Sequence, residues 1–145
     1  MLRTLLASAL LAASYAGILL AASTTARADD SAGKDRVFEI RTYHCYEGRL
    51  PALNKRFAEH TVALFKKHGI ESVGYWVPAD EKQGKANTLI YVLAYPSRDA
   101  AKKSWEDFRN DPEWKKAQAE SEKDGKIVEK VDSVYLNPTE YSFIK

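Results

Sequence analysis

The sequence predicts an α+β fold, a ferredoxin-like βαββαβ unit in which four strands form one antiparallel sheet with helices on one face. Two observations predict it. Four segments alternate apolar and polar residues, as half-buried strands do. Segments with apolar residues at helical spacing separate the first strand from the second and the third from the fourth. Helices on one face leave the other sheet face uncovered, and this predicts a homodimer packed through that open face.

Residues 1–28 have the layout of a secretory signal peptide. A basic start at Arg3 precedes an apolar run over residues 5–22, and Ala26-Arg27-Ala28 has the small residues of a cleavage site. We expect cleavage after Ala28 and export to the periplasm or to the outside of the cell. The alternative is an uncleaved membrane anchor, because about 18 apolar or small residues approach the length that spans a bilayer.

Charge and cysteine content exclude several classes of protein. The chain of 145 residues has 22 Lys and Arg against 20 Asp and Glu. The two arginines of the leader account for the excess, so residues 29–145 carry no net charge and offer no field for nucleic acid or a membrane surface. The single cysteine, Cys45, cannot form a disulfide framework. In an oxidising compartment it is either buried and inert or paired across a dimer.

The ordered domain is expected over residues 37–145, after a polar, flexible lead-in over residues 29–36. Residues 37–46 alternate and predict the first strand. One face of this strand carries Phe38, Ile40 and Thr42, and the other carries Glu39, Arg41 and Tyr43.

Residues 50–68 predict an amphipathic helix of about five turns. Pro51 suits its first turn and Gly69 suits the position after its end. The stripe facing the sheet consists of Leu50, Leu53, Phe57, Thr61, Leu64 and His68, with His60 at its edge.

Residues 70–77 and 87–95 predict a hairpin of two strands, joined by a polar loop. In the second of them, Leu89, Tyr91, Leu93 and Tyr95 point to one face and Ile90, Val92 and Ala94 to the other.

Ser97 is the expected N-cap of a second helix that continues to about Asn110. Asp111 and Pro112 restart the helix, and Gly125 ends it. Residues 127–136 predict the last strand, followed by Asn137-Pro138.

Several segments, taken together and in order, resemble the NIPSNAP family. They are Phe38–Tyr43, Phe57–His60, His68-Gly69 with Gly74–Trp76, Asn87, Tyr95–Arg98, Phe108 with Asp111–Trp114, and Leu136–Thr139 with Tyr141-Ser142. The resemblance implies a dimeric α+β barrel, a fold that the family shares with small cofactor-free oxygenases and stress-related binding proteins. It implies a fold more than a function.

Three residues are candidates for chemistry. His60, at the edge of the helix stripe, could act as a general base or acid. The alternative to a catalytic role is a structural one, in which His60 is partly buried and forms a hydrogen bond to a strand residue. Arg41 and Tyr43 share a strand face and could hold an anion. The favoured alternative is that Glu39, two residues away, forms an ion pair with Arg41 or with the other subunit.

Four aromatic residues could line a binding pocket, or belong to the core or a dimer interface: Tyr75, Trp76, Tyr91 and Tyr95. No metal is expected, because the three histidines at 44, 60 and 68 lack the spacing of ligands. No nucleotide-binding or serine-hydrolase motif is present, so no cofactor is expected.

Two hypotheses for function follow. The favoured one is an exported, non-catalytic homodimer that binds a small apolar or aromatic ligand or a protein partner. The other is a cofactor-free oxygenase or isomerase in which His60 removes a proton while Arg41 and Tyr43 stabilise the anion. The enzyme requires the three side chains to converge on an open cavity, whereas a binding protein tolerates a filled interior.

Overall fold

A computed structural model describes residues 36–145, so the predicted leader and nearly all of the predicted lead-in lie outside the described part. The strands lie within one residue of the predicted boundaries. The elements are β1 (Val37–Cys45), α1 (Leu50–Arg56), α2 (Val62–Lys67), β2 (Glu71–Trp76), β3 (Thr88–Tyr95), α3 (Arg98–Asn110), α4 (Pro112–Ser121) and β4 (Val128–Leu136).

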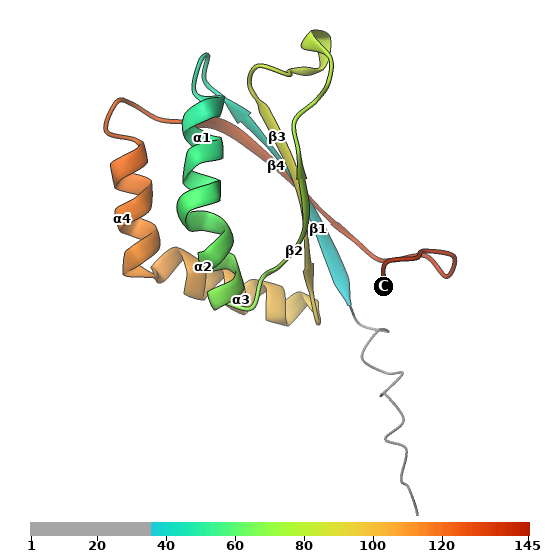
Figure 1. The fold of residues 1–145 in the computed structure, drawn as a ribbon. Helices are drawn as coiled ribbons and strands as arrows, with labels where there is room; N and C mark the ends of the chain where they lie inside the picture. Colours follow the sequence, from blue (N-terminus) through green and yellow to red (C-terminus); the bar gives the residue numbers. More distant parts are fainter. Residues whose placement is uncertain (1–35) are drawn as a thin grey trace, which may run out of the picture.

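The four strands form one antiparallel sheet in the order β2-β3-β1-β4. This order places the first strand at the centre, paired with β3 on one side and β4 on the other. All helices lie on one side of the sheet (Figure 1). The α+β, ferredoxin-like fold class predicted from the sequence is confirmed.

The first helix is continuous but not regular. A single π-helical turn at Phe57–Thr61 joins α1 to α2, and in it the Val62 N–H bonds to the carbonyl of Phe57. Such a wide turn changes the angular spacing of the side chains. Thr61 continues the buried stripe, while His60 lies outside it on the exposed surface. The prediction that His60 lies at the edge of the sheet-facing stripe is therefore wrong.

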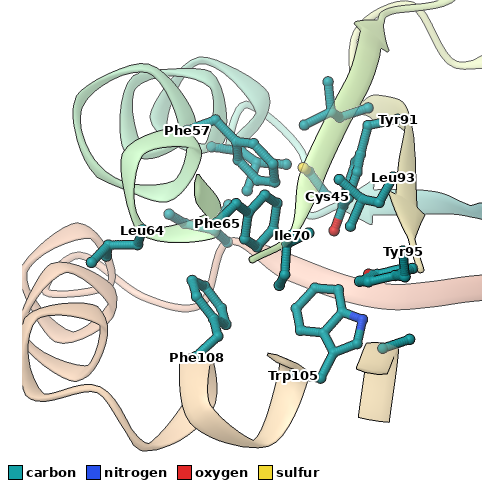
Figure 2. Packing of buried hydrophobic residues seen from close by; sticks show 14 of the residues in the cluster. Cys45, Phe57, Leu64, Phe65, Ile70, Tyr91, Leu93, Tyr95, Trp105 and Phe108 are labelled. Carbon is teal, nitrogen blue, oxygen red and sulfur yellow. The ribbon is translucent and has the colours of Figure 1, made fainter. Parts of the chain in front are cut away.

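The hydrophobic core fills the space between the sheet and the helices (Figure 2). Phe65 lies at its centre, with ring centroids 5.4 Å from Trp105 and 4.9 Å from Phe108. The predicted alternation of β3 is confirmed, since Tyr91 and the other three residues of its face are all buried against the helices.

α3 lies against β3, whereas α4 packs against α1. The predicted break between them is confirmed at Asp111. Its carboxylate accepts the Glu113 N–H at 2.7 Å as an N-cap. It also contacts His68 Nε2 at 2.7 Å and Lys67 Nζ at 2.9 Å. Asp111 thus joins the end of α2 to the start of α4. Within residues 36–145, no helix is long and apolar enough to cross a membrane.

The pH dependence of stability tests this junction. Hydrogen bonds from Lys67 and His68 lower the pKa of Asp111 below its usual 3.8. A lowered pKa stabilises the fold above pH 3.8, and that contribution is lost as the pH falls through the folded-state pKa. Asp111→Asn keeps a capping side chain but removes the charge. We expect it to unfold at lower urea than wild type at pH 7, with the difference closing toward pH 2.

The control is Asp107→Asn, which removes an exposed carboxylate paired with Lys103. Its effect should be small at every pH, because exposed helix pairs contribute little. A difference between wild type and Asp111→Asn that does not change from pH 7 to pH 2 would show that the charge has no role.

Candidate functional site

The inner face of the sheet carries a buried carboxylate. Glu39 is 1% exposed, and each of its two carboxylate oxygens accepts two hydrogen bonds. The Oε1 atom accepts from Arg41 Nη1 at 2.7 Å and from Ser133 Oγ at 2.6 Å. The Oε2 atom accepts from the Tyr95 hydroxyl at 2.8 Å and from Trp105 Nε1 at 2.7 Å. All four acceptor positions of the carboxylate are occupied.

These bonds decide the ionisation of Glu39. Burial by itself raises the pKa of the carboxyl, but the hydrogen bonds from Ser133, Trp105 and Arg41 together outweigh it, so the pKa lies below 4.5. The carboxylate stays ionised at neutral pH and has no free lone pair for a proton. It acts as a structural anchor and not as a general base.

Arg41 and Tyr43 lie together, as their shared strand face predicts. The Arg41 guanidinium lies 5.5 Å from the Tyr43 ring centroid and 4.4 Å from that of Trp105. It forms the predicted ion pair with Glu39 at 2.7 Å. Burial alone lowers the pKa of Arg41, but Tyr43, Tyr91 and Glu39 raise it beyond the usual value, so the charge is permanent. The favoured alternative for Arg41 is thereby confirmed.

The four aromatic candidates do not line one pocket. Tyr75, Tyr91 and Tyr95 lie on the helix side, where the Tyr91 ring centroid is 5.6 Å from that of Tyr75. Trp76 follows Tyr75 on the strand, so it points to the other face, where it is 52% exposed.

The Tyr91 hydroxyl is the one unusual group of this cluster. It is buried without a hydrogen-bond partner among the described residues, as is Nε of Arg41. Burial raises the pKa of Tyr91 well above its usual value, so the phenol remains protonated. Tyr91 therefore offers a hydroxyl and not a phenolate to the interior.

His60 is separated from Arg41 and Tyr43. Its side chain is 49% exposed and lies 3.9 Å from Glu59. With Leu64 and Glu113, it lines a groove of about 480 Å³ between the first helix and α4. The structure therefore places His60 on the outer side of the helical layer, away from the inner face of the sheet.

The open face of the sheet is mostly apolar, with His44, Lys130 and Asp132 at one end. Trp76, Val134 and Leu136 are exposed there, and the helices all lie on the other side of the sheet (Figure 1). A shallow, open cavity of about 420 Å³ lies where this face meets the chain beyond β4. Its walls are formed by Phe38, Val73, Trp76, Val92, Leu136, Asn137, Pro138, Thr139, Ser142 and Ile144.

Gly74 positions Trp76 on this face. A Cβ atom at residue 74 would lie 2.6 Å from Cη2 of Trp76, closer than side chains tolerate. The glycine therefore lets the indole ring lie back across its own strand. The strand also bulges between Ser72 and Gly74, and Val73 joins the wall of the cavity.

The described part of the chain contains no cluster of metal ligands, and its one thiol is buried. Within residues 36–145, no group of three or more His, Cys, Asp or Glu side chains gathers as metal ligands. Cys45 is 1% exposed, and burial raises the pKa of its thiol. A buried thiol fits the inert alternative, because a partner chain cannot reach it.

The fold and the uncovered apolar face define a class of protein, a ferredoxin-like α+β domain with dimeric α+β barrels as its structural relatives. The NIPSNAP family profile matches residues 38–143, so the chain belongs to the NIPSNAP family. The resemblance seen in the sequence is confirmed. No curated protein matches the chain.

Solved structures share this fold. A NIPSNAP family protein of unknown function from Agrobacterium tumefaciens is 24% identical, with a TM-score of 0.66 over 77% of this chain and 96% of that chain. An uncharacterised NIPSNAP-like domain protein from Burkholderia xenovorans is 15% identical, with a TM-score of 0.64 over 75% and 90%. SnoaB, a cofactor-independent oxygenase from Streptomyces nogalater, is 13% identical, with a TM-score of 0.50 over 73% and 95%.

Sequence reasoning missed the full partner set of Glu39 and the cavity on the open face. Trp105 and Ser133 lie 66 and 94 residues from Glu39 in the chain, and no local pattern connects them. The cavity needs residues beyond β4, where no periodic pattern indicates packing. The one available signal was an acidic residue at a core-facing position of the first strand.

Replacing Glu39 tests the anchor. Glu39→Gln keeps the shape of the side chain, but it leaves the partly buried Arg41 without its counterion and turns an amide NH2 toward hydrogen-bond donors. We expect a loss of about 3–5 kcal/mol in the free energy of unfolding, the usual effect of breaking a buried ion pair. Urea unfolding followed by circular dichroism measures it.

Glu71→Gln is the matched control, because it removes an exposed carboxylate that pairs with Arg36. Its cost should be at most about 1 kcal/mol. Equal stability of Glu39→Gln and wild type would contradict the structural role of the network.

Proposed function

We propose that the protein is an exported, homodimeric binding module without chemistry of its own, which takes a small apolar or aromatic ligand in the cavity on the open face of the sheet. The observation that carries this proposal is the contrast between the two faces. The inner face is packed against the helices, whereas the outer face is apolar, exposed and hollowed.

The packing of the inner face disfavours a ligand there. Tyr91, Leu93 and Tyr95 are at most 1% exposed, and the Tyr95 and Trp105 donors beside Glu39 are already engaged. A ligand between sheet and helices would have to displace side chains of the core. Interiors are packed as densely as crystals, so such displacement is costly.

The dimensions of the outer cavity favour a ligand. Its volume of about 420 Å³ lies within the range of small-molecule sites, about 300–1,000 Å³. Apolar side chains such as Phe38, Trp76 and Val92 form most of its walls. The polar residues Asn137, Thr139 and Ser142 beyond β4 also line it. This combination suits an apolar or aromatic molecule with one polar end.

The oxygenase hypothesis has less geometric support. SnoaB, which shares the fold, is a cofactor-independent oxygenase. In this chain the proposed base, His60, lies in the outer groove, whereas Arg41 is bonded to Glu39 on the inner side. The proposed base and the proposed anion site therefore do not face a common cavity. The binding function is the better supported of the two.

Export is part of this proposal, and the N-terminal sequence tests it. The signal-peptide pattern of residues 1–28 supports cleavage after Ala28. In a Gram-negative host we expect the full chain to be recovered from the periplasm with Asp29 as its first residue, as read by Edman degradation. Recovery from the membrane fraction with Met1 in place would favour the uncleaved anchor.

Ligand binding is tested with an apolar fluorescent probe, N-phenyl-1-naphthylamine, titrated into the chain of residues 29–145. We expect saturable binding, and we expect Trp76→Ser to weaken it about tenfold or more, since covering an exposed aromatic side chain contributes about 1.5–3 kcal/mol. Fluorescence titration measures the dissociation constant.

Two controls accompany the titration. Tyr46→Ser removes an exposed aromatic that lines a different cavity, and His60→Ala removes the alternative catalytic residue. Both should bind the probe as wild type does. Absence of saturable binding, or equal weakening by Tyr46→Ser, would overturn the proposed site.

A further inference from the structure

The segment after β4 carries the most exposed large apolar residues of the described chain. Tyr141 is 83% exposed, Phe143 is fully exposed and Ile144 is about half exposed. We name residues 137–145 the C-terminal segment. It lies beyond the end of β4 on the side of the sheet away from the helices (Figure 1). Two nearly bare aromatic side chains so close together are typical of an interaction surface.

The C-terminal segment has a defined shape. The Ser142 N–H bonds to the Thr139 carbonyl at 3.0 Å, and Lys145 Nζ bonds to the Glu140 carbonyl at 2.6 Å. Arg36 Nη1 bonds to the Lys145 carbonyl at 2.6 Å, which ties the end of the chain to the start of β1. These contacts keep Phe143 exposed, whereas Ile144 turns into the wall of the cavity.

The open face and the C-terminal segment both offer apolar surface for a dimer interface. A standard interface buries about 800 Å² on each partner, of which about 500 Å² is apolar. At their exposures, Trp76, Val134 and Leu136 offer about 250 Å². Tyr141 and Phe143 add about 300 Å². The most exposed residues of the face and the segment together reach the required apolar area.

Charge does not oppose such an association. At one end of the open face, His44, Lys130 and Asp132 contact one another, with Asp132 oxygens 3.1 Å from His44 Nε2 and 2.8 Å from Lys130 Nζ. The carboxylate is thus matched within its own chain. When a second copy packs on this face, it therefore meets no unpaired carboxylate at that end.

We propose that the C-terminal segment is a dimerisation arm: Tyr141 and Phe143 of one copy pack on the open sheet face of a second copy, and the partner's Phe143 covers the apolar cavity beside Trp76. In a two-fold dimer the exchange is reciprocal, so both arms and both faces are buried at once. Each ligand cavity is then completed by the other chain. This inference rests on the proposed homodimer and names the element that forms it.

Phe143→Ser tests the arm. Phe143 is fully exposed within its own chain, so the substitution should leave the fold intact, as circular dichroism checks. We expect the dimer dissociation constant of residues 29–145 to rise about tenfold or more, as for a central aromatic of an interface. Light scattering coupled to size-exclusion chromatography over a dilution series measures it. A chain ending at Asn137 should be monomeric.

Thermal melting provides a second readout. Association of folded chains makes the melting temperature rise with protein concentration. Wild type and the control Tyr46→Ser should show this dependence, and Phe143→Ser should lose it. If Phe143→Ser dimerises as tightly as wild type, the proposed dimerisation arm is wrong, whereas the proposed homodimer is supported. If wild type is a monomer throughout the dilution series, the homodimer and the arm are both wrong.

Discussion

The carboxylate of Glu39 is the interaction on which the interior of this protein depends. It lies on the central strand and accepts hydrogen bonds from β3 through Tyr95, from β4 through Ser133 and from α3 through Trp105. A buried carboxylate destabilises a fold unless its acceptors are all occupied. Three neighbouring elements must therefore be in place together. The same carboxylate holds the Arg41 guanidinium, so the strongest charges of the inner face neutralise each other.

The two faces of the sheet carry different kinds of side chain, because the Glu39 network occupies the face that packs against the helices. On the helix side of β1, Glu39, Arg41 and Tyr43 form the Glu39 network or pack beside it, between Val37 and Cys45 of the core. Phe38 and Ile40 point to the other side, as do Val92 on β3 and Val134 on β4. Since side chains alternate along a strand, one sequence pattern specifies both surfaces. The face toward the helices closes the core, and the opposite face leaves an apolar surface available for association.

Most of the fold could be predicted from the sequence, because period-2 and helical patterns directly reflect burial. The ion pair of Glu39 with Arg41 could also be predicted, since residues two apart share a strand face. The position of His60 could not. Helical spacing assumes 3.6 residues per turn, and the π turn at Phe57–Thr61 breaks that assumption without a mark in the apolar pattern. Trp105 and Ser133 reach Glu39 only through tertiary structure.

The distribution of polar groups bears on function. Stabilising a transition state requires hydrogen-bond donors or charges directed at a reacting atom in a site from which water is excluded. The charged groups of the inner face are bonded to one another, and Cys45 is buried. The accessible surface around Trp76 is mostly apolar, and apolar walls select ligands by size and shape, discriminating weakly between functional groups. A surface of this kind can bind and associate, but it supplies little to lower a chemical barrier. For that reason we propose a binding module and not an enzyme.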